Sequence, residues 1–326
     1  MAAPHLGEFE RIARFFAPLA GPGGLGLVDD VALIDGPGNE QYALTTDTII
    51  EGVDYFPDDP PGLVAKKLLR VNLSDLAAKG ARPFGYLLTT ALPPARGEAW
   101  LEAFTAGLAA DQNEFGIALL GGDSSATPGP TTLSLMAIGR VEKGKAVLRS
   151  GARPGDVICV SGTIGDATLG LGILKGEFAA ASKKDRAFLV DRYHLPRPRL
   201  ALGQKLVGIA TAMIDVSDGL LADLKHICDA SGAAAWIYAD RVPRSEAARK
   251  LSKTLKDRRA RLLGGGDDYE LLFTSHPSSA YRIGDAMREA GVPVACIGEM
   301  TAGDGVKVID AKGRPIRIDI AGYSHF

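Results

Sequence analysis

Hydrophobic and polar positions follow helical spacing in some stretches of this chain and strand spacing in others. In 61–80, Val64, Leu68 and Val71 fall on one side of a helix, and Gly80 closes it. In 42–48, a strand-like apolar pattern carries several oxygen-bearing side chains. The same patterns predict helices at 9–16, 61–80, 98–115, 166–176, 186–195, 220–232, 245–255 and 279–291. They predict strands at 31–35, 42–48, 85–92, 117–123, 131–141, 156–162, 211–219, 233–240, 269–275 and 292–300.

Strands and helices alternate in both halves of the chain, which predicts two α/β domains. A turn-rich stretch, KAVLRSGARPGD, separates the two series. We therefore place an N-terminal domain at 1–147 and a C-terminal α/β domain at 148–326. Glycine and proline are scattered as turn residues, and the sequence contains no low-complexity tract or short repeat.

Composition fixes the size of the core and excludes some partners. A chain of 326 residues, 46% hydrophobic and 23% charged, can bury two sizeable cores. Its 37 Lys and Arg against 39 Asp and Glu give a formal net charge of −2, so no basic surface is expected. We expect neither a nucleic-acid nor a membrane partner. Glu8 and Glu10 stand where a signal peptide needs positive charge, and no 18-residue apolar run occurs, so we expect a cytoplasmic protein.

The cysteines and several motif matches do not indicate chemistry. Cys159, Cys228 and Cys296 lie far apart in the sequence without a C-x-x-C pair, and we expect reduced core residues. GPGGLG at 21–26 lies between helix-like and strand-like segments in the wrong order for a dinucleotide site. GRVEKGKA at 139–146 lacks the P-loop hydroxyl and is interpreted as an edge-strand turn. The five histidines show no paired spacing, which argues against triad hydrolysis.

A set of aspartates stands in small or turn-forming sequence rather than in mixed charge runs. Asp123 follows IALLGG and Asp215 follows TAMI, so each is expected at the carboxyl end of a strand. Asp75 lies in the apolar segment NLSDLAA, and few cationic residues adjoin these positions. Two like charges about 4 Å apart repel by roughly 4 kcal/mol at an effective dielectric of 20, so such a cluster needs metal ions. The full set is Asp29, Asp30, Asp47, Asp75, Asp123, Asp215, Asp218, Asp267 and Asp268.

Hard oxygen donors without His or Cys favour Mg²⁺. For any single aspartate, a helix cap or an Asx-turn is an equally good explanation. The glycine-rich stretches LLGGDSS, VSDGL and LLGGGDDYE would let backbone N–H groups approach a phosphate. From the residues alone we predict an ATP–Mg²⁺ enzyme without a P-loop.

The order of these motifs resembles the thiamine-monophosphate kinase family of the aminoimidazole-ribonucleotide-synthetase-like superfamily. The matching stretches are VDDVAL, TTDTIIEGV, VNLSDLAAKGA, LLGGDSS, RSGARPGD, IDVSDGL and GGDDYELLF, and they run through the whole chain. The resemblance implies ATP-dependent phosphorylation of thiamine monophosphate to thiamine diphosphate by direct in-line transfer with a Mg²⁺ cluster. It also implies two α/β domains of this type, with the N-terminal domain forming the interface of a homodimer.

The resemblance assigns roles to particular residues. It implies metal ligands at Asp30, Thr45, Thr46, Asp47, Asp75, Asp123, Asp215 and Asp218. It implies ATP contacts at Thr105, Gly122, Asp123, Arg149 and Ser217, and substrate contacts at Asp54, Asp267 and Tyr323. Within these sets, Asp47, Asp123, Arg149 and Asp218 are assigned to catalysis.

The chain departs from the family pattern mainly on the substrate side. Val28 replaces a glycine, Asp267 replaces a glutamate, and Asp54 stands where the family has histidine. Glu51, between the metal and substrate segments, is expected to face solvent. Two alternatives stay open: a sister ATP-dependent synthetase or phosphotransferase acting on another small substrate, and a catalytically silent nucleotide-binding protein.

Overall fold

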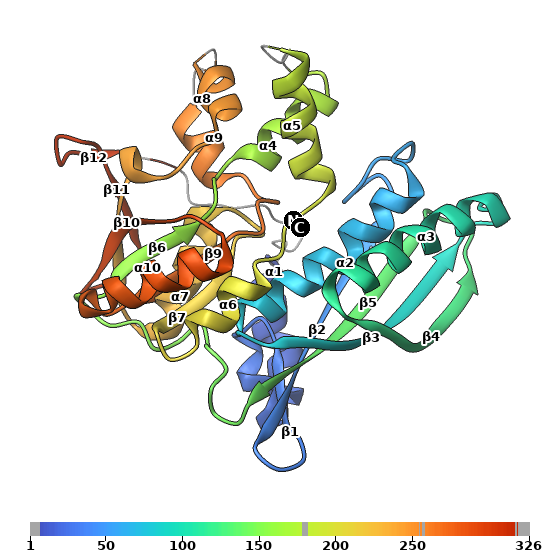
Figure 1. Ribbon diagram of the computed structural model, residues 1–326, viewed down its shortest axis with the longest axis horizontal. Helices are drawn as coiled ribbons and strands as arrows, with labels where there is room; N and C mark the ends of the chain where they lie inside the picture. The colour runs from blue at the N-terminus through green and yellow to red at the C-terminus, as the bar shows by residue number, and fades with distance from the viewer. Residues whose placement is uncertain (1–6, 178–181, 254, 256–257, 317, 319–326) are drawn as a thin grey trace, which may run out of the picture.

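The computed structural model describes residues 7–177, 182–253, 255, 258–316 and 318, and it contains two β-sheets with helices packed on them (Figure 1). The first sheet comprises β1 Ala32–Asp35, β2 Glu40–Ile50, β3 Arg82–Leu92, β4 Ala118–Ala126 and β5 Thr132–Glu142. Its order is β1-β2-β5-β3-β4, and only the β3/β4 pair is parallel.

Two long helices cover one face of this sheet. Helices α2 Pro61–Ala78 and α3 Glu98–Phe115 lie side by side on it (Figure 1). Alternate residues of the central strand β5, such as Leu133 and Leu135, are fully buried beneath them. Each such leucine contributes about 1.5–3 kcal/mol on burial.

In the described part of the chain, the opposite face of the first sheet is uncovered. Thr46 and Thr48 of β2 point to this face and are exposed, in alternation with the buried Thr45. Phe84 and Leu87 of β3 lie on the same face and are 38% and 37% exposed. Because apolar side chains line it, this open face of the sheet is a candidate interaction surface.

The second sheet has seven strands in the order β12-β11-β8-β10-β6-β9-β7, and only β8 and β11 are parallel. Its strands are β6 Val157–Ser161, β7 Ala210–Asp215, β8 Ala234–Tyr238, β9 Leu271–Ser275, β10 Val294–Thr301, β11 Val306–Ile309 and β12 Pro315–Ile316. Alternate residues of β7 join two cores: Met213 packs with α2, and Ile214 packs with α7 Leu220–Ser231. The helix α2 therefore connects the two halves.

The remaining helices are short. They are α1 Glu8–Arg11, a π-helical turn at Ile12–Phe16, 3-10 turns at Ala17–Leu19, Pro22–Leu27, Ala239–Arg241 and Pro277–Ser279, α4 Asp166–Leu174, α5 Lys183–His194, α6 Leu200–Leu206, α8 Glu246–Ser252, α9 Arg258–Gly264 and α10 Ala280–Ala290. In the described part of the chain, no helix is long and apolar enough to cross a membrane.

Three details differ from the sequence expectations. Asp123 does not end a strand, because Ser124 and Ser125 continue the β3/β4 pairing and β4 runs to Ala126. The turn after Val141 does not follow an edge strand, because β5 is the centre of its sheet. The helices α6 and α9 and the strands β11 and β12 were not predicted, since each is short.

Candidate active site

Three carboxylates from distant parts of the chain meet where the two halves join. Asp30 precedes β1, Asp75 lies on α2, and Asp215 is the last residue of β7. Each offers an oxygen within 4.8 Å of the other two. The sequence predicted these residues as metal ligands, and the fold brings them into one cluster.

The strand β2 holds its predicted ligands beside α2. Thr45 Oγ1 donates to Asp75 Oδ2 at 2.6 Å, and the Asp47 N–H donates to Asn72 Oδ1 at 3.2 Å. Asn72 is fixed in turn, because its Nδ2 donates to the Leu68 carbonyl at 2.9 Å. Period-two alternation on β2 therefore directs Thr45 and Asp47 toward the helix.

Two cations adjoin this cluster, contrary to the expectation from sequence. Lys79 is completely buried, and its Nζ lies 2.7 Å from Asp29 Oδ1 and 2.5 Å from Asp30 Oδ2. Arg149 Nε donates to Asp30 Oδ1 at 2.7 Å, and the Arg149 N–H donates to Asp29 Oδ2 at 2.8 Å. Lys79 Nζ also donates to the Met213 carbonyl of β7 at 3.2 Å, so it joins the two halves. The sequence analysis missed Lys79, which lies four residues after Asp75 and directly follows the last residue of α2.

The cations neutralise only part of the cluster. Although burial acts to raise it, Lys79 and Arg149 hold the pKa of Asp30 below its usual value. Burial and the neighbouring carboxylates raise the pKa of Asp47 to about 6 and that of Asp215 to about 7. The pKa of Asp75 is raised well above its usual value by burial and by Asp47 and Asp215. The site therefore has more buried carboxylates than its own cations can balance.

Glycine-rich loops flank the cluster. Asp223 on α7 accepts hydrogen bonds from the Asp218 and Gly219 N–H groups at 3.2 and 3.0 Å, which fixes the loop after β7. The Asp267 N–H donates to the Ser217 carbonyl at 2.8 Å, so the two predicted loops touch. Asp267 has φ 69°, a left-handed conformation that is costly for a residue with a side chain.

The predicted substrate residues meet a lysine and a tyrosine that the sequence analysis missed. Lys67 Nζ is buried, donates to the Asp54 carbonyl at 3.0 Å and lies 3.7 Å from Asp267 Oδ1. It also lies 3.9 Å from the centre of the Tyr193 ring, whose hydroxyl donates to the same Asp54 carbonyl at 3.1 Å. Asp54 Oδ2 accepts from the Ile50 N–H at 2.7 Å. This Lys67–Tyr193 contact joins α2 to α5 beside both acids.

Glu51 was expected to face solvent, and this expectation is wrong. Arg96 Nη2 donates to Glu51 Oε2 at 2.6 Å, and Arg96 Nε donates to Thr131 Oγ1 at 3.1 Å. Although partial burial acts to raise it, hydrogen bonds with Thr131 and Arg96 and the charge of Arg96 hold the pKa of Glu51 below its usual value. Glu51 therefore has a structural role, tying the end of β2 to the loop after β3.

Several predicted site residues lie apart from the cluster in this chain. In the strand pairing, Thr48 on β2 lies opposite Ser134 on β5, which lies opposite Thr89 on β3, which lies opposite Asp123 on β4. Asp123 is therefore three strand spacings, about 14 Å, from Thr48 across the sheet. Gly122 is its neighbour on β4. Thr105 lies on the exposed side of α3, where its hydroxyl donates to the Leu101 carbonyl.

Thr46 points to the open face of the first sheet, so only its backbone is near the cluster. Tyr323 lies outside the described residues. Asp268, adjacent to the predicted Asp267, is buried and accepts from the Gly165 N–H at 2.6 Å, which caps the start of α4.

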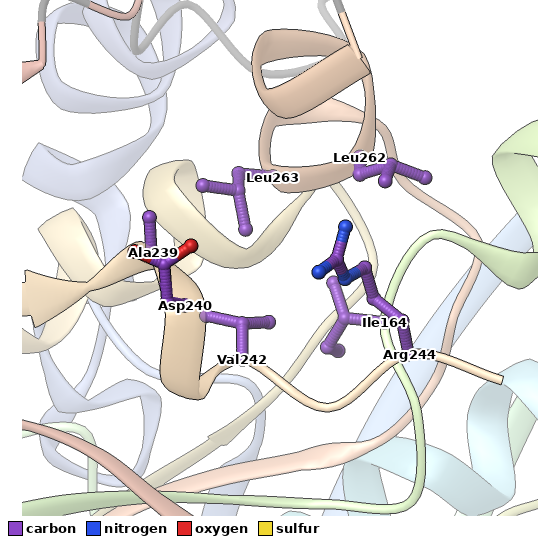
Figure 2. A pocket seen from close by; sticks show the side chains of 7 residues that line it. All are labelled: Ile164, Ala239, Asp240, Val242, Arg244, Leu262 and Leu263. Atoms are coloured by element: carbon purple, nitrogen blue, oxygen red, sulfur yellow. The ribbon is translucent and has the colours of Figure 1, made fainter. Parts of the chain in front are cut away.

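A small pocket elsewhere does not take part in this site. Figure 2 shows it between the 3-10 turn at 239–241 and α9, with Leu262, Leu263, Val242 and Arg244 in its wall. About 20 Å³ is free inside it, which is room for about one water molecule. Its lining residues carry none of the clustered carboxylates.

Comparison with known proteins covers nearly the whole chain. Residues 28–141 match the family described as AIR synthase related protein, N-terminal domain, and residues 153–311 match the AIR synthase related protein, C-terminal domain. Thiamine-monophosphate kinases of Salmonella typhimurium and Escherichia coli K12 are 40% and 41% identical to it, and each alignment covers 98% of both chains.

Solved structures agree with these matches. AaThiL complexed with AMPPCP and TMP aligns with a TM-score of 0.87 at 29% identity, covering 100% of this chain and 99% of that one. The thiamine-monophosphate kinase of Stenotrophomonas maltophilia K279a aligns with a TM-score of 0.78 at 40% identity, covering 92% and 94%. The hydrogenase maturation protein HypE of E. coli, at 21% identity and a TM-score of 0.72 over 86% and 85% of the two chains, shares the fold alone.

Proposed function

This chain belongs to the thiamine-monophosphate kinases of the AIR synthase related family, and we propose that a Mg²⁺ cluster held by its own carboxylates supports its reaction. The reaction is the transfer of the γ-phosphoryl group of ATP to thiamine monophosphate, which gives thiamine diphosphate and ADP. Because ATP is the donor, we place the reaction in the cytoplasm. The domain boundary is proposed at 147/148, in the connection between the two sheets.

The observation that carries the metal proposal is the meeting of Asp30, Asp75 and Asp215 within 4.8 Å. Their excess charge is not balanced by Lys79 and Arg149, and their oxygens are the ligands that Mg²⁺ prefers. The proposed ligand set is Asp30, Thr45, Thr46, Asp47, Asp75, Asp123, Asp215 and Asp218. Mg²⁺ held by these residues would supply positive charge that neutralises the phosphates of ATP and of thiamine monophosphate.

The protein's own groups hold and orient the two polyanions. Arg149 is fixed against Asp29 and Asp30, so its guanidinium is held in place beside the cluster, where we propose that it contacts ATP together with Ser217. The second pKa of a phosphate monoester is about 6, so the attacking oxygen of thiamine monophosphate is already ionised at neutral pH. No general base is then needed, and positioning with charge stabilisation supplies the catalysis.

The substrate contacts are proposed at the far end of the cluster from Lys79. Lys67 contacts the Asp54 carbonyl and lies 3.7 Å from Asp267, and the carboxylates of both acids can pair with a cationic ring or accept a hydrogen bond. The family histidine could donate to a phosphate, whereas ionised Asp54 only accepts. We therefore propose that Asp54 serves the thiazolium side of the substrate rather than its phosphate.

One assay tests the reaction directly. The purified chain is incubated with ATP, Mg²⁺ and thiamine monophosphate, and thiamine diphosphate is measured by chromatography. We expect product formation that stops when Mg²⁺ is chelated. Intact Mg–ATP binding without any thiamine diphosphate would overturn the substrate assignment and leave a sister enzyme or a silent binding protein.

We further propose a homodimer formed by the first sheet. In the described chain, residues 45–50 of β2 have no strand neighbour on the side away from β5, because β1 pairs only with 41–44. The strand β4 is the other edge, and all nine of its residues are exposed. A second copy could place its β4 beside 45–50 and cover the open face of the sheet.

Such a dimer would also complete the metal site. Asp123 is about 14 Å along the sheet from the Thr48 position in its own chain, but β4 of the second copy would bring its Asp123 beside Thr46 and Asp47. We propose that Asp123 and Gly122 on β4, together with Thr105 on α3, act across the dimer interface. Glycine is required at Gly122 by its own sheet, since a Cβ there would lie 1.8 Å from the Leu88 carbonyl oxygen of β3.

Mixed dimers test this arrangement. Asp75→Asn and Asp123→Asn should each abolish most activity alone. If Asp123 acts across the interface, a mixed dimer retains one complete site of two, and random association of co-expressed copies should restore about a quarter of wild-type activity. If both acids act within one chain, mixing restores nothing, and the proposal is wrong.

A further inference from the structure

Cys159 and Cys296 lie opposite each other on neighbouring strands. They are direct partners in the antiparallel β6/β10 pair, and their Sγ atoms are 2.9 Å apart. Antiparallel partners have Cα atoms about 4.5 or 5.5 Å apart, and disulfides form at about 4.4–6.8 Å. Both residues are free thiols here. The backbone therefore already suits a bond between them, although the two positions are 137 residues apart in sequence.

The two thiols differ in their access to solvent. Cys159 is completely buried in the core that also contains Phe273, whereas Cys296 is exposed, so the expectation that all three cysteines are core residues is wrong for Cys296. Within the described chain, β8 pairs with β10 only from Gly298 onward, so the segment that carries Cys296 has no strand on that side. A reagent in solution can reach Cys296 first.

The two thiols also differ in how readily they ionise to the reactive thiolate. The hydrogen bond with Cys159 and the charge of Arg241 lower the pKa of Cys296 to about 7. The same hydrogen bond and burial raise the pKa of Cys159. Because the thiolate is the nucleophile, Cys296 is the group that reacts at neutral pH, and Cys159 is placed to react second.

We propose that Cys159 and Cys296 form a modification site, a dithiol that a low-molecular-weight disulfide oxidises to an intramolecular disulfide. The Cys296 thiolate attacks one sulfur of RSSR, forming a mixed disulfide and releasing RS⁻. Cys159 then loses its proton, attacks Cys296 Sγ and releases the second RS⁻. The pair loses two electrons and two protons, and RSSR is reduced to two RSH.

The bond would act on stability rather than on the reaction. Neither thiol contacts the clustered carboxylates, so phosphoryl transfer should continue after oxidation. A cross-link between positions this far apart restricts the unfolded chain strongly, so the oxidised protein should melt several degrees higher than the reduced one.

The test uses the full chain and glutathione disulfide at millimolar concentration. Peptide mapping without reduction should find Cys159 joined to Cys296, with a mass loss of two hydrogens. The melting temperature should rise on oxidation and return to its initial value after reduction. The matched control Cys228→Ser, on α7, should behave like the wild type. Cys159→Ser should instead stop at a glutathione adduct on Cys296.

Three results would overturn the proposal. The wild type could keep both thiols, end as a glutathione adduct on Cys296, or show a cross-link through Cys228. Mapping of the wild type needs no variant, so the proposal stays testable even where Cys159→Ser does not fold. Thiamine diphosphate formation is measured separately, so failure here is distinct from failure of the proposed function.

Discussion

Lys67 gives the sharpest test at the scale of single residues. Its ammonium fixes the Asp54 carbonyl and lies beside Asp267, so Lys67→Met should loosen both proposed substrate contacts. Loss of a charged hydrogen bond costs about 1.5–3 kcal/mol, so KM for thiamine monophosphate should rise roughly tenfold to a hundredfold. KM for ATP should change little, because the ATP contacts are proposed at Arg149 and Ser217.

The neighbouring lysine supplies the control. Lys66 lies on the same helix but points away, 3.5 Å from Asp111 Oδ1, so Lys66→Met should leave both KM values unchanged. Lys67→Arg should recover part of the loss, because it keeps the charge. An equal rise of both KM values in Lys67→Met would indicate a general structural role and contradict the prediction.

Single residues were predictable where a local pattern marked them. Asp75 within an apolar helix and Asp215 at the end of an apolar strand were both identified as unusual from the sequence, and the fold places them together. The sequence did not mark Lys79, Lys67 and Tyr193 as site residues, because their partners lie on other elements and no local pattern encodes such contacts. Cys159 and Cys296 illustrate the same limit, since their strand register joins residues far apart in sequence.

At the scale of elements, α6 and α2 approach through glycine. A Cβ on Gly203 would lie 2.0 Å from the Ala77 carbonyl oxygen of α2, so Gly203→Ala should push the helices apart. Overpacking of this kind costs about 1–3 kcal/mol, and the denaturation midpoint should fall accordingly. Gly284 on α10 meets no atom within 4 Å, so Gly284→Ala should stabilise slightly through helix propensity. If both substitutions changed the denaturation midpoint equally, the close approach of Gly203 to Ala77 would not be the cause of the destabilisation.

Long periodic elements followed from the sequence, whereas four short ones, α6, α9, β11 and β12, did not. The 18 residues of α2 carry enough turns for their apolar spacing to be unambiguous. Strand existence was also predictable from alternation, but strand order was not, because pairing partners are non-local. The expectation that Asp123 ends a strand was wrong for this reason: Ser124 and Ser125 gain their strand character from β3.

At the scale of the whole molecule, the carboxylate cluster should make stability depend on pH and on metal. Asp47 and Asp215 have folded pKa values of about 6 and about 7, above the ordinary value of about 4. The folded state therefore binds protons more tightly than the unfolded chain. The resulting stability is fully present below about pH 4 and is lost as pH rises through 6 and 7.

Thermal unfolding of the metal-free protein tests whether its stability falls as pH rises. In a chelator, the melting temperature should fall between about pH 5 and pH 8, and Mg²⁺ should raise it most at the upper end, where the carboxylates are ionised. Asp75→Asn removes one carboxylate, so its metal-free profile should be flatter. A melting temperature that rises across this window without metal would contradict the assigned shifts.

The two-domain arrangement was predictable from alternation of strands and helices and from overall length, and the family matches confirm it. The uncovered face of the first sheet was not predictable, because the sequence of a strand does not indicate whether a helix or a second copy of the chain covers it.

The unpaired strand edges have a consequence for newly synthesised protein. In the described chain, the outer side of β4 has no strand neighbour, and residues 45–50 of β2 have none on the side away from β5, where side chains hold only the Asp47 and Ile50 N–H groups. Edges of this kind recruit other chains without selectivity and begin aggregates. A single copy is therefore exposed to misassembly from the moment its first sheet folds, and rapid pairing with a second copy would protect it as well as complete its site.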